Sequence, residues 1–401
     1  MGVTSASAAV TDDFGVGAPS LAKPASGGRY IYVDDSGRNM VTAAKGSYSD
    51  GSPWRNINRV SCLTTGRLPA WVGMVGWSTD QACPEPDITH PLASVEAGVS
   101  VARAGDVVVV RSGQYFERVG YHAQRGTASR PIVLQNYPGE RVEVHGWLKL
   151  VEADYWTVEG LRWIWNRVET QGAQSVVNFI GGTGWTFAHN EVRDSHGVAN
   201  VLVRAKGGAS SSSQRVDYAP HDYSIIGNCI AFNRGTQAGL DHNIYLMPSI
   251  WSTGGEITHN LLVSAPYGGN IKAAGSRDPN ESPRDVNISY NTLLGGASGM
   301  IFGLKARDIA FTRNVVSLSR NSSYYDGGVK TYSMSYPGTI GVKDNVIGTY
   351  RFAIRESGWP SEHIYVRRIV NSSAPYTGSV KNCSITFTKS WTQDNYGHHA
   401  G

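Results

Sequence analysis

"EITHNLLVS", residues 256–264, places a short apolar run on each side of a single asparagine, Asn260. Each half of this stretch predicts a β-strand, and the Asn predicts a bend between them, followed by a turn that carries Gly. The same form recurs as TFAHN ending at Asn190, SIIGN at Asn228, NISYN at Asn291, AFTRN at Asn314 and GVKDN at Asn345. The copies lie roughly 30 residues apart, a period that indicates a repeat architecture.

A repeat of this length buries its apolar side chains only by stacking on its neighbours, which predicts a solenoid. A right-handed parallel β-helix fits best, with coils about 4.8 Å apart. An Asn at each bend then hydrogen-bonds the Asn of the next coil and satisfies backbone groups of the turn. We interpret the Asn row as structural and predict an all-β, right-handed parallel β-helix (solenoid) with Asn-ladder turns and loop insertions.

Four cysteines are present. Cys62 and Cys83 flank an irregular stretch and are predicted to form a disulfide. Cys229 and Cys383 each follow an Asn, so we expect both to face the core at equivalent bends. They would then lie several coils apart, on the order of 20 Å or more, whereas a disulfide needs Cα atoms within about 7 Å. We therefore expect Cys229 and Cys383 to be free, buried thiols.

The composition agrees with a β protein. The chain has 47 Gly, 11 Trp and 20 Tyr but only 17% charged residues, which is untypical of helical or disordered proteins. The net charge of +4 suits an anionic partner. The sequence has no Lys/Arg block of the kind that predicts nucleic-acid binding. No apolar run approaches the roughly 20 residues of a membrane span. The absence of CxxC and HExxH patterns argues against a structural zinc site.

Four N-terminal segments carry a family resemblance. They read RYIYVDDSGRN (29–39), DGSPWRNINRV (50–60), AGDVVVVRSGQYFERV (104–119) and GTASRPIVLQNYPGERVEVHG (126–146). Together they resemble the N-terminal half of bacterial secreted right-handed parallel β-helix proteins of the pectate-lyase-like superfamily. The Asn-ended coils resemble the repeat of the same superfamily, so the resemblance covers about residues 29–350. It implies the fold and not one activity, because this fold hosts lyases, hydrolases, epimerases, transferases and phage tail-spikes.

We expect a single β-helix domain over residues 29–390, with an insertion at 61–97. Residues 1–28 are expected to be a flexible N-terminal segment and 391–401 a C-terminal tail. The early run SASAA resembles the small-residue end of a secretory signal. We therefore expect an extracellular, monomeric protein from which the signal peptide has been removed.

The strands that follow successive bends can be aligned. They are NVLVR (200–204), NIYLM (243–247), NIKAA (270–274) and MIFGL (300–304). Strand side chains alternate, so this alignment predicts one inward column of Val201, Ile244, Ile271 and Ile301. The same register predicts that Tyr245 and Lys272 lie side by side and face solvent. Asn200, Asn243 and Asn270 form the neighbouring outward column, and Arg204 lies one column across.

This outward surface suits a polysaccharide, because aromatic rings offer stacking planes and amides bind hydroxyl groups. The leading hypothesis is a lyase that cleaves a uronic-acid glycan by β-elimination, a reaction that needs a base, an acid and a cation for the carboxylate. Lys272 or His242 is the expected base, Tyr245 the acid, and Arg204 or Arg277 the cation. The expected substrate-binding residues are Asn243, Asn270, Asp241, Tyr267, Arg277, His196 and Asn200.

The resemblance implies Lys or Arg bases, often with Ca²⁺, but the acidic cluster expected for calcium is not evident. Asp278 and Glu281, with Asp285, are the only nearby acidic group, and they are the residues that would hold a Ca²⁺ ion.

Alternatives remain open. A β-helical glycoside hydrolase would use two carboxylates, such as Asp241 with Asp278 or Asp194. A C5-epimerase shares the first proton abstraction of the lyase. A carbohydrate-binding or tail-spike-like adhesin would have a groove without a proton-transfer pair.

Overall fold

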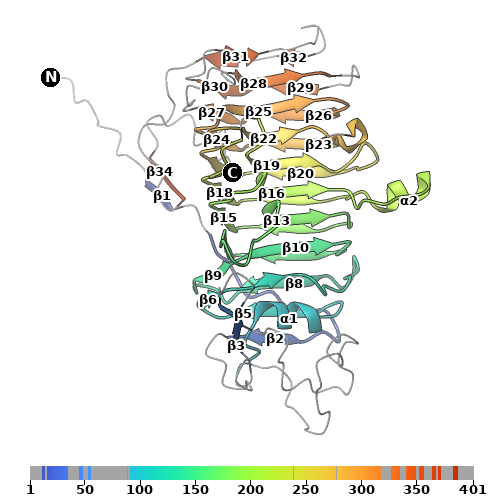
Figure 1. The fold of residues 1–401 in the computed structure, drawn as a ribbon, viewed down its shortest axis with the longest axis vertical. Coiled ribbons are helices and arrows are strands. Elements are labelled where there is room, and N and C mark those ends of the chain that lie inside the picture. Colours follow the sequence, from blue (N-terminus) through green and yellow to red (C-terminus); the bar gives the residue numbers. More distant parts are fainter. Residues whose placement is uncertain are drawn as a thin grey trace, which may run out of the picture.

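The computed structural model describes residues 11–13, 16–34, 45–47, 53–55, 88, 91–237, 239–276, 278–317, 327–334, 340–348, 352–355, 364–366, 369–371 and 383–386. Among these residues, three all-parallel sheets run the length of the molecule, and their coils stack from β2 at one end to β32 at the other (Figure 1). The prediction of a parallel β-helix is confirmed. No helix among the described residues is both long and apolar enough for a membrane crossing.

We number the sheets for reference. Sheet 1 contains β7 (Arg118–Val119), β10 (Trp147–Val151), β13 (Ser175–Ile180), β16 (Ala199–Arg204), β19 (His242–Met247), β22 (Gly269–Ala273), β25 (Ser298–Gly303), β28 (Gly327–Tyr332) and β31 (Phe352–Arg355). Sheet 2 contains β2 (Tyr30–Val33), β5 (Val107–Val110), β8 (Ile132–Asn136), β11 (Trp156–Glu159), β14 (Thr186–Ala188), β17 (Ser224–Ile226), β20 (Gly255–Thr258), β23 (Arg284–Ser289), β26 (Arg307–Thr312), β29 (Ile340–Lys343) and β32 (Ile364–Val366). Sheet 3 contains β6 (Gly113–Tyr115), β9 (Val142–His145), β12 (Arg162–Ile164), β15 (Glu191–Arg193), β18 (Cys229–Ala231), β21 (Leu261–Val263), β24 (Thr292–Leu294), β27 (Val315–Ser317), β30 (Asn345–Ile347) and β33 (Ile369–Asn371).

The bend between sheets 2 and 3 is built as the repeat predicts. At the central coil, the backbone N–H of Asn228 donates to Oδ1 of Asn260 at 2.9 Å, and the N–H of Asn260 donates to Asn291 at 3.0 Å. The residue before each Asn has a left-handed backbone, as at His259 with φ 56°, and this turns the chain sharply. The ladder is continuous from Asn190 to Asn345, so the structural interpretation of the Asn row is confirmed.

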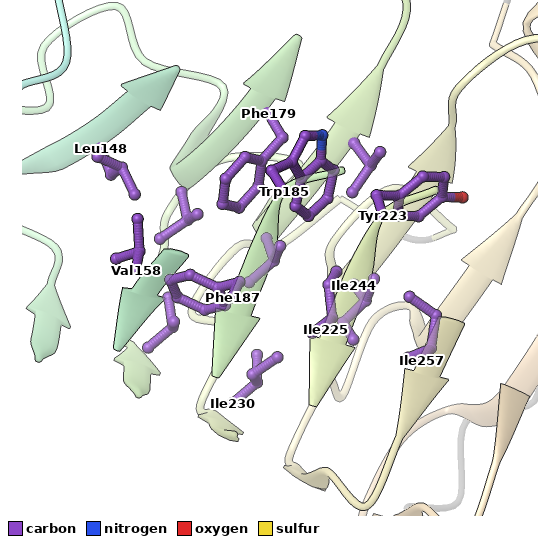
Figure 2. Packing of buried hydrophobic residues seen from close by; sticks show 14 of the residues in the cluster. Leu148, Val158, Phe179, Trp185, Phe187, Tyr223, Ile225, Ile230, Ile244 and Ile257 are labelled. Atoms are coloured by element: carbon purple, nitrogen blue, oxygen red, sulfur yellow. The ribbon is translucent and has the colours of Figure 1, made fainter. Parts of the chain in front are cut away.

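The core is the narrow space enclosed by the three sheets. Aliphatic columns fill most of it, and one stretch holds stacked rings, with Phe179 and Trp185 at 3.9 Å and Trp185 and Tyr223 at 5.0 Å between centroids (Figure 2). Each fully buried Ile, Leu, Val or Phe contributes roughly 1.5–3 kcal/mol relative to an exposed one. The end of this core beside β2 and β5 is covered by helix α1 (Val95–Val101), which buries Val95 and Val99.

Two short pairs lie outside the coils. β3 (Lys45–Ser47) pairs antiparallel with β4 (Pro53–Arg55). β1 (Thr11–Asp13) pairs antiparallel with β34 (Ser384–Thr386) beside the stacked coils of the β-helix (Figure 1). Helix α2 (Ser212–Asp217) projects from the loop between β16 and β17.

The expectation of free thiols at Cys229 and Cys383 was wrong. The two residues form a disulfide, with Cα atoms 5.9 Å apart. The error came from reading residues 382–383 as another bend of the solenoid. Cys383 instead lies on the outer side of sheet 3, in a buried cluster with Cys229 and apolar residues such as Leu261 and Val315. Cys62 and Cys83 lie outside the described residues.

The expected domain limits are only partly described. Residues 16–28, expected to be flexible, lie against the coils, where the N–H of Ala18 donates to Asn136 at 2.8 Å and that of Ala22 donates to Gln135 at 2.8 Å. Residues 61–87 of the expected insertion and the tail at 391–401 lie outside the described residues.

Candidate functional site

The outward side of sheet 1 carries the residues singled out by their sequence. Tyr245 of β19 pairs with Lys272 of β22, and Leu202 of β16 pairs with Tyr245, as predicted. The pairing of β22 with β25 is shifted by one residue from the expected register, because Met300 rather than Ile301 pairs with Ile271. Strand β25 is apolar or small throughout, so its pattern has no alternation from which the register can be read.

Tyr245 and Lys272 point outward but do not face solvent, contrary to our expectation. Tyr245 is 5% and Lys272 7% exposed. The Lys272 ammonium lies 4.7 Å from the ring centroid of Tyr245 and 5.7 Å from that of Tyr332, which reaches over from β28. Gly303 makes this arrangement possible, because a Cβ there would lie 2.3 Å from the Tyr332 ring. The lysine is therefore held between two aromatic faces.

Burial changes the protonation of this lysine. No carboxylate of the described residues forms an ion pair with Lys272, and desolvation lowers its pKa to about 8. The Tyr245 hydroxyl donates to the carbonyl of Gly275 at 3.1 Å, and burial raises its pKa, so the phenol stays protonated at neutral pH. The Lys272 amine, which is half deprotonated near pH 8, thus lies beside the Tyr245 phenol, which retains its proton.

His242 is fully buried at the beginning of β19. Its Nδ1 accepts the backbone N–H of Gly269 at 2.9 Å, and its ring packs edge-on against Tyr245 at 5.3 Å. Nε2 has no hydrogen-bond partner among the described residues. Burial, followed by the charge of Lys272, lowers the pKa of His242 well below its ordinary value, so the imidazole is neutral. It is a packing neighbour of the Lys272–Tyr245 pair.

Asn200, Asn243 and Asn270 were expected to bind substrate, and the structure contradicts this. All three are fully buried. The Nδ2 of Asn200 donates to Oδ1 of Asn243 at 2.8 Å, and Asn243 donates in the same way to Asn270 at 2.8 Å. They form a second Asn ladder, at the bend between sheets 3 and 1, which leaves no amide available to a ligand.

A pocket opens near the Tyr245–Lys272 pair, across the ends of β16 and β19. Its volume is about 210 Å³, and it is lined by residues after β16, on α2, after β19 and in the loop around the 3₁₀ turn Pro279–Glu281. The lining residues are Arg204, Ala205, Lys206, Gly207, Gly208, Ala209, Arg215, Met247, Ser249, Trp251, Asp278, Asn280 and Glu281. Met247 follows Tyr245 by two positions on β19, which puts the pocket wall on the order of 7 Å along the strand from the pair.

The pocket is polar and rich in cations. Arg204 is half-buried with a lowered pKa caused by burial, and its Nε has no hydrogen-bond partner among the described residues. Lys206 is hydrogen-bonded to Glu152. Arg215 lies over the ring of Trp251 at 5.1 Å. Arg204 and Arg215 therefore keep donors available to an anionic group.

The two acidic residues in the pocket were the suggested calcium ligands. Asp278 accepts the N–H of Asn280 at 2.9 Å, and Glu281 accepts the N–H of Ser276 at 3.2 Å. No group of three or more His, Cys, Asp or Glu within the described ranges is arranged to hold a metal ion. Calcium takes six to eight oxygen ligands, so the described residues do not fit a Ca²⁺ site here.

Three further expected residues, Asp241, Tyr267 and His196, are not among those that line this pocket. Asp241 is 3% exposed, accepts the N–H of Gln237, and has a pKa raised by burial. Tyr267 is exposed at the turn before β22, and exposed His196 packs against Trp165 at 5.9 Å. Arg277 is outside the described residues.

Of the carboxylates expected in a hydrolase, Asp278 lines the pocket, whereas Asp241 and Asp194 are not among its lining residues. Asp194 is instead paired with Arg193 at 2.9 Å and with Arg234 at 2.8 Å.

Sequence reasoning missed Lys206, Arg215, Trp251 and Tyr332. The first three lie on loops whose lengths differ from coil to coil, so the repeat does not align them. Tyr332 lies two strands from Lys272, in a strand that we did not align. The run RAKGG at 204–208, in which Arg204 and Lys206 precede two glycines, is a sequence signal that points to this loop.

Comparisons with known proteins agree on the fold. No protein-family model and no curated protein matches the sequence. Similar solved structures include XylC in complex with xylose, at 12% identity and TM-score 0.53 over 86% of this chain and 70% of that one. Pectate lyase Pel9A has 12% identity and TM-score 0.48 over 92% and 86%, and an alginate lyase from Paenibacillus sp. str. FPU-7 has 11% and 0.36 over 69% and 96%. The similarity to XylC, whose TM-score is 0.53, supports the fold alone and leaves the activity to the site.

Proposed function

We propose that this protein is a carbohydrate-active enzyme that cleaves a uronic-acid polysaccharide by β-elimination. The observation that supports this most is a buried lysine without an ion-pair partner among the described residues, beside a protonated phenol and a cationic pocket. Elimination needs these elements, namely a base, a proton donor and a cation for the sugar carboxylate. The names of similar structures, a pectate lyase and an alginate lyase, are consistent with this class.

In the proposed reaction, Arg204 and Arg215 bind the carboxylate and make the neighbouring C–H more acidic. Neutral Lys272 takes that proton, and the C–H electrons form a double bond as the C–O bond to the leaving sugar breaks. Tyr245 gives its proton to the leaving oxygen after it releases the carbonyl of Gly275. Substrate reaches Lys272 only when the half-buried ring of Tyr332 turns aside, and such side-chain rotations are fast.

The test is an ultraviolet assay for unsaturated uronate on polygalacturonate, alginate and neutral glycans, with added calcium so that no activity is overlooked. Lys272→Ala and Lys272→Arg are expected to lose about 10²–10⁴-fold in kcat, the usual contribution of a general base. Tyr245→Phe and Arg204→Ala are also expected to lower the rate. Lys343→Ala, on sheet 2, is the matched control for loss of a lysine.

Hydrolysis is the second candidate, because Asp278 and Glu281 both line the pocket. New reducing ends without unsaturated product, lost in Asp278→Asn or Glu281→Gln, would replace elimination by hydrolysis. Binding of polyuronate without either product would leave a carbohydrate-binding protein or adhesin.

We also propose that the protein is extracellular. The Cys229–Cys383 disulfide supports this, because disulfides persist in oxidising compartments and are rare in the cytosol.

A further inference from the structure

Exposed aromatic rings gather in the first coils at the bend between sheets 3 and 1, away from the pocket. Phe116 directly follows β6 of sheet 3 and is 44% exposed, and Tyr121 lies two residues after β7 of sheet 1 and is 50% exposed. They are among the most exposed large apolar side chains of the described residues. Single exposed apolar residues are common, but a group of them marks an interaction surface.

Each ring rests on an aromatic residue of the next coil. Phe116 stacks on His145 with ring centroids 4.7 Å apart and planes inclined by 15°, and Tyr121 packs on Trp147 at 5.9 Å. The indole Nε1 of Trp147 is buried and has no hydrogen-bond partner among the described residues. These four residues, which we call the aromatic platform, form two supported ring surfaces at the sheet 3 to sheet 1 bend.

The platform is flanked by positive charge on its Trp147 side, whereas His145 contacts the Glu143 carboxylate at 3.2 Å. The Arg118 guanidinium lies 6.0 Å and the Lys149 ammonium 5.5 Å from the ring centroid of Trp147. Arg118 also pairs with Glu169 at 3.6 Å, whereas no described carboxylate forms an ion pair with Lys149. Rings that present flat apolar faces next to a cation favour an anionic sugar polymer over a neutral one.

The strand register connects the platform to the proposed active site. Lys149 pairs with Asn178, Asn178 with Leu202, Leu202 with Tyr245 and Tyr245 with Lys272. Lys149 and Lys272 thus belong to one outward column, four strand spacings of about 4.8 Å apart, or about 19 Å. A polymer that lies along the helix axis can contact both places, whereas a short oligosaccharide cannot.

We propose that the aromatic platform is a second, distal binding site for an acidic polysaccharide, which holds the polymer while another part of it occupies the pocket. This assignment rests on the proposed function for the identity of the ligand. The double variant Phe116→Ala/Tyr121→Ala, made in a Lys272→Ala background that prevents cleavage, tests it. The matched control is Tyr290→Ala, which removes a half-buried ring stacked on His259 at the bend between sheets 2 and 3.

Binding is measured by fluorescence titration with polygalacturonate or alginate and with the corresponding trisaccharide. The double variant is expected to bind polymer at least about tenfold more weakly and trisaccharide unchanged, because only polymer spans both sites. Lys149→Gln is expected to weaken polymer binding and to reduce its dependence on salt. Unchanged polymer binding in the double variant, with an intact thermal transition, would overturn the proposal. Equal or tighter binding of single-stranded DNA at the platform would replace the polysaccharide by a nucleic acid.

The two proposals fail separately. If wild-type protein forms unsaturated product and the double variant binds polymer normally, only the distal site is wrong. If no product forms but polymer binding depends on Phe116 and Tyr121, only the elimination chemistry is wrong.

Discussion

A buried lysine without an ion pair has a protonation state that its surroundings can tune. Lys272 contacts two phenol rings, and these give a modest cation–π attraction in place of the hydration it has lost. The ordinary pKa of lysine is 10.5, and desolvation lowers that of Lys272 to about 8. At neutral pH a useful fraction of this side chain is therefore an uncharged base, as catalysis by proton abstraction requires.

The lowered pKa predicts the pH dependence of the reaction. Because the base must be neutral, kcat/KM for a polyuronate is expected to rise with pH through about 8 and then level off. His242 stays neutral over this range and adds no second step, because burial lowers its pKa well below 6.5. Initial rates across pH 6 to 10 check this. A profile that is flat through pH 8, or that falls, would remove Lys272 from the role of base.

At the scale of the strand and its bend, the Asn ladder is the strongest local determinant of the fold. Oδ1 of Asn260 accepts the Asn228 N–H at 2.9 Å, and its Nδ2 donates to the carbonyls of Ile225 and Thr258 at 2.8 and 2.9 Å. Because each buried polar group left unpaired costs about 1–3 kcal/mol, Asn260→Ala is expected to lower the free energy of unfolding by roughly 3 kcal/mol or more.

Urea denaturation measures this loss. The matched control is Asn287→Ala, which removes an exposed Asn from neighbouring strand β23 and should change stability by less than about 0.5 kcal/mol. A loss at Asn260 as small as that of the control would mean that water replaces the ladder without cost.

The same elements explain what could be predicted from the sequence. Identical Asn residues at the bends reveal the coils, and clear alternation gives the Tyr245–Lys272 pairing. The register at Met300 was missed because β25 lacks polar alternation. The burial of Lys272 was missed because the ring that covers it, Tyr332, comes from another coil. The pocket depends on Arg215 and Trp251, whose loops follow no repeat, so only tertiary structure brings them together.

At the scale of the whole molecule, a solenoid has exposed flanks and ends that the repeat itself does not cover. The outward apolar residues of sheet 3, such as Leu261, form a buried cluster that includes Cys383, which a disulfide joins to Cys229. This cross-link joins positions 154 residues apart in sequence. A disulfide of such long range is expected to stabilise the fold mainly by restricting the unfolded chain.

The end beside β2 and β5 is covered by α1, and two carboxylic acids are buried here, Glu96 of this helix and Glu117 at its N-terminus. Glu117 accepts the N–H groups of Val95 and Glu96 at 2.8 and 2.9 Å, and Glu96 accepts that of Gly120 at 2.5 Å. Desolvation raises the pKa of Glu96 to about 8 and that of Glu117 to about 7, from an ordinary value of 4.5. The folded protein therefore keeps protons that the unfolded chain has already released.

The sign of the effect on stability follows from this difference. Because the unfolded state binds fewer protons between pH 4.5 and 8, the free energy of unfolding falls as pH rises through this interval and levels off above it. Glu96→Gln keeps the hydrogen-bond acceptor and cannot ionise, so its melting temperature is expected to fall less between pH 5 and 9 than that of the wild type. Glu140→Gln is the control, because Arg111 lowers the pKa of Glu140 and its contribution is lost toward acid instead. An equal fall in melting temperature for wild type and Glu96→Gln across this range would show that the pKa of Glu96 is not raised in the folded protein.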